Sequence, residues 1–245
     1  MSLDAQIPPE NPIQHTSRKR LLAPWWHTAI VVAVLLLLSL GGSRGKHPLA
    51  ERSRLPQYIW TMVWEWVMTG IIWLGIRKRI RLRDLIGGRW ATVEDFCLDV
   101  VFAGAFWGCA MFVLGVAAML MHLDHPGRLE SMRKQIGFLR PDSNLELTVW
   151  YCVSATAGFC EEIIFRGYLQ QQFAAIANSM LLGVLLSALV FGASHGYEGV
   201  PTMILLGIFG LMFGLLAWWR KSLRAGMMAH AWHDALVGSI LRVLK

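Results

Sequence analysis

Long apolar stretches, separated by short polar and basic connections, dominate the pattern of hydrophobic positions along the chain. A transmembrane helix needs about 20 predominantly apolar residues, and seven stretches come close to this requirement. They cover residues 24–42, 57–76, 96–121, 146–165, 179–195, 200–219 and 225–243. The pattern predicts an all-α fold, a polytopic membrane helix bundle with about seven transmembrane helices.

Changes in this pattern divide the chain into four parts. Residues 1–22 carry three prolines and a basic cluster, and we expect a disordered N-terminal tail. Residues 23–122 are expected to form the N-terminal transmembrane helices, residues 123–144 a polar loop, and residues 145–245 a second transmembrane core. The first stretch also has features of a cleaved signal peptide, but the extension of its apolar run from Ala23 favours a retained span.

Composition supports a membrane protein. Apolar residues make up 55% of the chain and charged residues 16%, whereas globular proteins average about 45–50% and 25%. Mean hydropathy is +0.46. These values exclude a disordered chain, a collagen-like chain and a disulfide-rich secreted domain.

The net charge of +7 is placed in the connections between the apolar stretches. Basic connections set membrane topology and contact anionic lipid headgroups. With no recognition motif for nucleic acid present, we expect the lipid bilayer and not a nucleic acid as the partner of these residues. The connection 77–89 holds six Lys and Arg residues, and it favours a cytoplasmic N-terminus.

Ionisable residues inside apolar stretches are costly and are candidates for function. The first group is Glu161-Glu162-Ile-Ile-Phe-Arg166. On a helix, Glu162 and Arg166 stand four residues apart on one face and can form an ion pair. Glu161 points about 100° away and has no local partner. Desolvation favours the protonated form of an unpaired carboxylate, which suits a general base near neutral pH. A helix end with solvated charges is the alternative.

A second group, Phe191-Gly-Ala-Ser-His195, lies at the end of the next apolar stretch. An imidazole can act there as a base, a proton shuttle or a metal ligand. Phe191 lies one helical turn earlier on the same face. Interfacial packing is the alternative for both side chains.

The third group is His230-Ala-Trp-His233-Asp234. His230 and Asp234 are four residues apart and face one way, so the pair could orient an imidazole, donate to an oxyanion or hold a metal. His233 is three residues from His230 and could take any of these roles. A polar turn at the membrane interface is the alternative.

The order of these groups within apolar stretches resembles the motifs E-E-x-x-x-R, F-x-x-x-H and H-x-x-x-N/D of the CPBP family. The family includes type II CAAX prenyl endopeptidases, bacterial self-immunity proteins of the Abi group and related processing proteases. The resemblance covers about residues 154–234, roughly a third of the chain. Each motif alone is weak, but the three together in a membrane context are fairly specific.

The resemblance implies an intramembrane endopeptidase, a multi-pass protein of the bacterial inner membrane that hydrolyses a membrane-embedded or lipidated protein or peptide. In the family, a glutamate and a histidine activate water, and the third motif polarises the scissile carbonyl. The motif positions carry over to the catalytic residues Glu161, His195, His230 and Asp234, the structural ion pair Glu162–Arg166, and the supporting residues Phe191 and His233.

Asp234 departs from the asparagine of the commoner family form, and an ionised carboxylate cannot donate to an oxyanion. Asp234 could be protonated, could orient His230, or could bind zinc together with His195 and His230. Because H-E-x-x-H and H-x-x-E-H are absent from the sequence, we expect no cofactor, with zinc as the alternative.

The hydropathy edges leave one difficulty. If the fourth stretch ended near residue 165 and the fifth began near 179, Glu161 and His195 would lie at different membrane depths. A fourth helix that continues past Gln170-Gln171-Gln172, tilted helices or a re-entrant segment would each resolve it.

Two other functions fit the same residues. A non-catalytic Abi-like immunity or scaffold protein would bind a membrane peptide in the same groove. A proton-coupled transporter would use the buried acids and imidazoles, but the sequence lacks the inverted repeat expected of many such proteins.

Overall fold

The computed structural model describes residues 21–44 and 53–243, and this part of the chain is helical with no strand. The predicted all-α fold class is therefore confirmed. Residues 1–20 of the predicted tail lie outside the described residues. Elements η2 and η4 are 3₁₀ helices, η3 is a π-helix, and the others are α-helices. In chain order the elements are α1 (Trp25–Arg44), α2 (Leu55–Ile76), α3 (Leu82–Ile86), α4 (Val93–Leu120), α5 (Pro126–Ile136), η2 (Gly137–Leu139), α6 (Asn144–Glu161), η3 (Glu162–Leu169), α7 (Gln170–Ile176), α8 (Met180–Ser194), η4 (Gly196–Glu198), α9 (Val200–Arg220) and α10 (Arg224–Val243).

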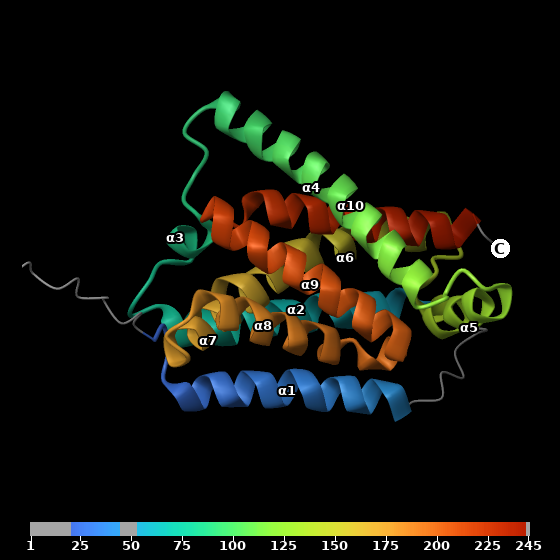
Figure 1. Cartoon of the computed structure of the whole chain (residues 1–245), viewed down its shortest axis with the longest axis horizontal. Helices are drawn as coiled ribbons and strands as arrows, with labels where there is room; N and C mark the ends of the chain where they lie inside the picture. Colours follow the sequence, from blue (N-terminus) through green and yellow to red (C-terminus); the bar gives the residue numbers. More distant parts are fainter. Residues whose placement is uncertain (1–20, 45–52, 244–245) are drawn as a thin grey trace, which may run out of the picture.

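Most of the long helices run along the long axis of the molecule, and α4 crosses the others obliquely (Figure 1). The short helices α3 and α5 lie at opposite ends of this bundle. The sequence predicts a polar loop at 123–144, but this segment contains the helices α5 and η2.

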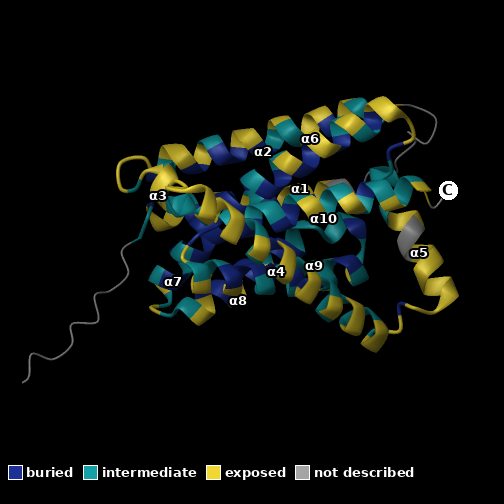
Figure 2. Ribbon diagram, turned by 90° about the horizontal axis from the view of Figure 1, so that it is seen from above, coloured by how far each residue is buried: buried dark blue, intermediate teal, exposed yellow. Residues whose placement is uncertain are grey.

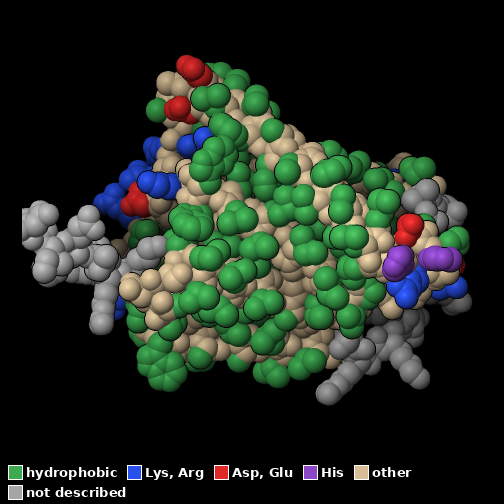
Figure 3. All heavy atoms as spheres, viewed as in Figure 1, with side chains coloured by type: hydrophobic (Ala, Val, Ile, Leu, Met, Phe, Trp, Pro, Cys, Tyr) green, Lys and Arg blue, Asp and Glu red, His purple; other side chains and the backbone are tan. Residues whose placement is uncertain are grey.

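The surface is that of an integral membrane protein. Apolar side chains cover the visible face between the two ends, and the charged side chains gather at those ends (Figure 3). Many residues of the outer helices are exposed (Figure 2), including Trp60, Phe112 and Leu189. Among the described helices, α2, α4 and α9 are long and apolar enough to cross a bilayer, and the apolar helix segments 25–41 and 180–194 are shorter. The number of seven spans stays a prediction.

The fourth apolar stretch continues well beyond its hydropathy edge at residue 165. Helix α6 passes into the π-helix η3 and then into α7, which ends at Ile176. Gln170 and Gln172 lie inside this helix and are completely buried. Gln172 Nε2 donates to Thr28 Oγ1 at 2.7 Å and to the Ala23 carbonyl at 3.0 Å. Because these bonds satisfy the side-chain amide of Gln172, this polar residue can be buried and the helix can continue through it.

Two glycines allow helices to approach closely at positions that border the candidate site. A Cβ atom at Gly158 would lie 2.7 Å from the Met227 carbonyl of α10, and one at Gly192 would lie 2.7 Å from the Met203 carbonyl of α9. Glycine at these positions therefore lets α6 pack on α10 and α8 pack on α9.

Candidate active site

The hairpin formed by η3, α7 and α8 brings Glu161 and His195 to the same level. Glu161 lies fifteen residues before the end of α7 at Ile176, and His195 lies fifteen residues after the start of α8 at Met180. The two arms are therefore about equally long, since each residue advances a helix by about 1.5 Å. His195 Nε2 lies 4.0 Å from Glu161 Oε1. Of the three explanations left open by the sequence, the continued fourth helix accounts for this meeting.

The second glutamate of the first motif forms a buried ion pair. Arg166 Nη1 lies 3.0 Å from Glu162 Oε1, and both side chains are 1% exposed. The pair lies within the π-helix, a rare conformation that is frequent at functional sites. Its residues 162–169 are all buried.

Aromatic rings surround the guanidinium of Arg166. Its Cζ atom lies 4.4 Å from the ring centroid of Phe191 and 5.1 Å from that of Phe213. Arg166 Nη2 also donates to the carbonyl of Gly210 at 3.3 Å. Phe191 therefore stabilises the charge of Arg166 beside the motif glutamates, because the quadrupole of an aromatic ring attracts a cation that lies over its face.

His230 is held between three carboxylates. Its Nδ1 lies 3.1 Å from Glu162 Oε1, whereas its Nε2 lies 3.7 Å from Glu161 Oε2 and 3.8 Å from Asp234 Oδ2. The hydrogen bond that orients the imidazole is thus made by Glu162, which also binds Arg166. Asp234 faces Nε2 at a distance that is too long for a hydrogen bond. Glu162, and not Asp234, therefore makes the hydrogen bond that orients the His230 ring.

His195 has one nitrogen fixed by the backbone. Its Nδ1 lies 2.8 Å from the carbonyl oxygen of Phe191. A carbonyl only accepts, so Nδ1 carries the hydrogen, and the neutral ring presents the lone pair of Nε2 toward Glu161. The ring of His195 also contacts Phe191, with centroids 4.8 Å apart.

Glu161 faces both imidazoles but is hydrogen-bonded to neither. Its Oε2 is buried without a hydrogen-bond partner in the described part of the chain. The separations of 4.0 Å from His195 and 3.7 Å from His230 exceed hydrogen-bond length, and such gaps commonly hold a bridging water. Two imidazoles and one carboxylate can therefore share a small polar molecule.

His233 is separate from this cluster. Its ring packs against Phe209 with centroids 4.7 Å apart, and its Nδ1 is buried with no hydrogen-bond partner among the described residues. The sequence spacing allowed His233 to replace His230, but of these two histidines it is His230 that lies beside the motif glutamates.

Two acidic residues near the cluster were missed by the sequence analysis. Glu65 of α2 is 7% exposed, and its carboxyl group is close enough to those of Glu161 and Asp234 to interact with them electrostatically. A carboxyl group inside the apolar stretch 57–76 was a signal that could have found it. Glu198 of η4 is also buried, and this burial raises the pKa of its carboxyl group, while the charge of His195 acts in the opposite direction.

The proposed zinc ligands were also compared with the geometry of metal sites. In residues 21–44 and 53–243 no group of three or more His, Cys, Asp or Glu side chains is arranged to hold a metal ion. Whether zinc binds at His195, His230 and Asp234 stays a prediction.

Fold and site together define an integral membrane protein with a partly buried glutamate–histidine site. Residues 143–236 match the family model described as type II CAAX prenyl endopeptidase Rce1-like. This match confirms the family resemblance of the three motifs and indicates a peptide hydrolase. None of the curated proteins and none of the solved structures compared with the chain matches it.

Proposed function

We propose that the protein is an intramembrane endopeptidase of the glutamate type, in which Glu161 activates the water that attacks a peptide carbonyl. The observation that supports this most directly is the position of the Glu161 carboxylate between Nε2 of His195 and Nε2 of His230, at 4.0 and 3.7 Å. A water molecule bound in these gaps would have an acceptor on one side and a substrate carbonyl on the other.

In the first step, the water oxygen forms a bond to the carbonyl carbon while one water proton passes to Glu161. The lone pair of His195 Nε2 accepts the hydrogen bond from the second water proton and holds the nucleophile in place. In the second step, the tetrahedral intermediate collapses, the C–N bond breaks, and the proton on Glu161 passes to the leaving amine. Glu161 is thus regenerated, as general acid–base catalysis requires.

In the proposed reaction His230 stabilises the oxyanion. Glu162 accepts from its Nδ1 at 3.1 Å, so Nε2 can donate to substrate when the ring is protonated. Glu161, Glu162 and Asp234 all lie within 4 Å of its ring nitrogens, which compensates the charge of an imidazolium. A donor of this kind typically contributes about 3–4 kcal/mol to transition-state stabilisation.

The proposed substrate is a membrane-embedded or lipidated peptide, for which a prenylated C-terminal CAAX segment is the first choice because of the family match. Helices α6 and α10, which carry Glu161 and His230, have exposed residues along their outer faces (Figure 2). A substrate that is already in the bilayer can reach such a site laterally, whereas a soluble peptide would have to leave water.

The central test is Glu161→Gln in the full-length protein reconstituted in lipid nanodiscs, with a farnesylated CAAX peptide as substrate. Loss of the general base should lower the hydrolysis rate by about 10²–10⁴-fold. The Tm of the variant, measured by thermal melting, should equal that of the parent protein. Glu94→Gln, an exposed acidic position in the first turn of α4, is the matched control. Unchanged hydrolysis by Glu161→Gln would refute the proposal. Absence of peptidase activity in the parent protein would favour a scaffold.

We propose that catalysis needs no metal, because Glu161 and His195 lie close enough together to activate a water molecule and the sequence lacks the H-E-x-x-H and H-x-x-E-H motifs of zinc proteases. The test is the metal content of active, purified protein by mass spectrometry, followed by treatment with a zinc chelator. Full activity with substoichiometric metal is expected. Stoichiometric zinc, with activity lost on chelation and regained on zinc addition, would show that zinc is required.

We also propose residence in a bacterial inner membrane with the N-terminus in the cytoplasm. The basic connection between α2 and α4 and the basic residues between α9 and α10 lie at one end of the bundle (Figures 1 and 3), which would be the cytoplasmic end. Seven spans place the C-terminus outside. A reporter fused to the C-terminus that is active only outside the cytoplasm should therefore be active; if only a cytoplasmic reporter is active, the topology is wrong.

A further inference from the structure

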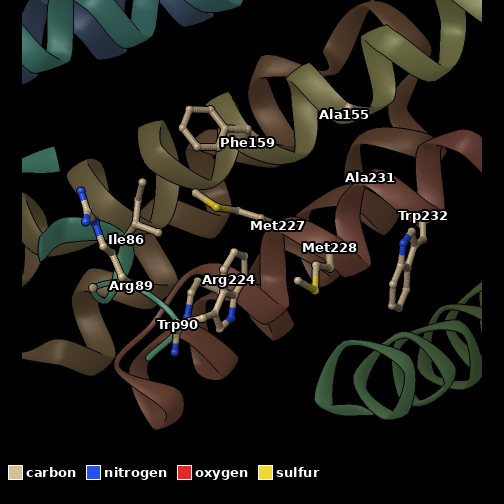
Figure 4. A pocket seen from close by; sticks show the side chains of 11 residues that line it. Ile86, Arg89, Trp90, Ala155, Phe159, Arg224, Met227, Met228, Ala231 and Trp232 are labelled. Atoms are coloured by element: carbon tan, nitrogen blue, oxygen red, sulfur yellow. The ribbon is translucent and has the colours of Figure 1, made fainter. Parts of the chain in front are cut away.

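One hollow in the described part of the chain is lined by none of the candidate catalytic side chains. It has a volume of about 700 Å³, within the range of typical ligand pockets. Its walls come from α6, α10 and the connection between α3 and α4 (Figure 4). We call it the α6–α10 groove, and most of its lining is apolar, with Phe159, Met227, Met228 and Trp232 as the largest apolar side chains of the two helices.

The two ends of the α6–α10 groove differ chemically. Arg89 and Arg224 lie toward one end, and Ala155, Ala231 and Trp232 lie toward the other (Figure 4). The basic end is also the end of the bundle where other Lys and Arg residues gather (Figure 3). A ligand that fits this groove has a long apolar part and an anionic group at one end.

Charge at the basic end is not balanced. Asp99 is completely buried, and it pairs with Arg220 at 2.9 Å and with Arg224 at 2.8 Å. It also accepts a hydrogen bond from Trp90 Nε1. One carboxylate therefore serves two arginines and an indole, which leaves a net positive charge beside the groove.

Unused donors are present at the same place. Arg224 Nη1 is buried and, in the described part of the chain, has no hydrogen-bond partner. Arg89 is exposed at the groove, and the neighbouring carboxylate of Asp84 pairs with Arg83 instead. A buried donor without an acceptor is costly, and a phosphate group in the groove would supply the acceptor.

The α6–α10 groove and the candidate active site use different side chains of α6 and α10. Phe159 in the groove and Glu161 in the site are two residues apart, a spacing at which side chains do not share a helix face. Gly158 of α6 packs closely against Met227 and Ala231 of α10, which both line the groove. None of the candidate catalytic residues Glu161, His195, His230 and Asp234 lines it.

We infer that the α6–α10 groove is a binding site for an anionic phospholipid of the surrounding membrane, with an acyl chain along Phe159, Met228 and Trp232 and the phosphate at Arg89 and Arg224. Basic pockets between transmembrane helices bind anionic lipid headgroups in other proteins. The bound lipid fills the space between α6 and α10, the helices that carry Glu161 and His230.

The test is native mass spectrometry of the full-length protein with equal amounts of phosphatidylglycerol and phosphatidylcholine of identical chains. The parent protein should retain phosphatidylglycerol preferentially. Arg89→Ala should weaken this retention roughly five-fold, whereas Arg83→Ala, exposed at the same end but outside the groove, should not. Ala155→Trp, which fills the exposed apolar end, should abolish retention of either lipid.

Three results would overturn the inference: equal retention of the two lipids, equal effects of Arg89→Ala and Arg83→Ala, or retention by Ala155→Trp. Displacement of the lipid by S-farnesylcysteine methyl ester would assign the groove to the substrate's lipid group and would also overturn it. Glu161→Gln should retain the lipid like the parent protein, so the outcome is independent of the proposed peptidase function.

Discussion

The ion pair inside the π-helix offers the sharpest test of the site's energetics. Arg166→Met keeps an unbranched apolar side chain among the aromatic rings but removes the positive charge that faces Glu162 at 3.0 Å. Because both side chains are 1% exposed, water cannot replace the lost partner. The substitution therefore leaves a carboxylate whose remaining partner is the hydrogen bond from His230 at 3.1 Å.

Breaking a buried ion pair by removing one partner costs about 3–5 kcal/mol. The bond from His230 stays in place, so we expect the lower part of this range, about 3 kcal/mol. For a chain of this size each kcal/mol lowers Tm by about 2–4 °C, and the expected decrease is about 6–12 °C. The double variant Arg166→Met/Glu162→Gln leaves no buried charge at the pair and should cost less than Arg166→Met alone, about 1–2 kcal/mol.

The measurement is thermal unfolding of the parent, both single variants and the double variant, in the same lipid nanodisc at pH 7. The double-mutant cycle isolates the coupling between the two side chains. If the double variant is destabilised as much as Arg166→Met, the loss comes from packing against Phe191 and Phe213 and not from an uncompensated carboxylate. That result would refute the account of the pair given above.

Three further substitutions separate the roles of the neighbouring residues. Asp234→Asn should retain hydrolysis to within tenfold, because an amide can donate to the oxyanion and the carboxylates of Glu161 and Glu162 still compensate the charge of His230; a more than tenfold loss in kcat would contradict this. His233→Phe should leave kcat unchanged, since its ring packs on an aromatic neighbour and its Nδ1 has no partner among the described residues; inactivity of a folded variant would show that His233 is part of the site. Glu65→Leu should raise Tm by a few degrees, because Glu65 Oε2 is buried without a hydrogen-bond partner in the described residues and such a group costs about 1–3 kcal/mol; a lower Tm would reveal a stabilising partner for this carboxyl.

The sequence was sufficient for the fold class and for the positions of the long helices. Hydropathy predicted a helix at 57–76 and one at 200–219, and α2 and α9 span Leu55–Ile76 and Val200–Arg220. Hydropathy is a good guide here because lipid offers the backbone no hydrogen-bond partner, so an apolar segment that crosses a bilayer has to pair its own N–H and C=O groups in a helix. It failed at Gln170 and Gln172, where tertiary hydrogen bonds make polar residues compatible with the bundle interior.

The local part of the site could also be predicted, and the remote part could not. The four-residue spacing from Glu162 to Arg166 is itself a helical contact, and the structure contains that pair. Glu65 has no such spacing to any motif residue, because it comes from α2 and meets the others only through packing of distant helices. The roles of the motif residues remain predictions that the substitutions above test.

The π-helix explains why these distant contacts converge. Four polar groups of this buried segment meet four different helices. Glu162 contacts His230 of α10, Arg166 donates to the Gly210 carbonyl of α9, the Phe165 carbonyl accepts from Ser187 of α8, and the Tyr168 hydroxyl bonds to Thr28 of α1. Sequence separations of 22 to 140 residues divide these partners. No local pattern encodes such a segment, because its conformation is stabilised by four surrounding helices at once. A substitution in any of them would therefore change the position of Glu162, and through it the orientation of the His230 imidazole.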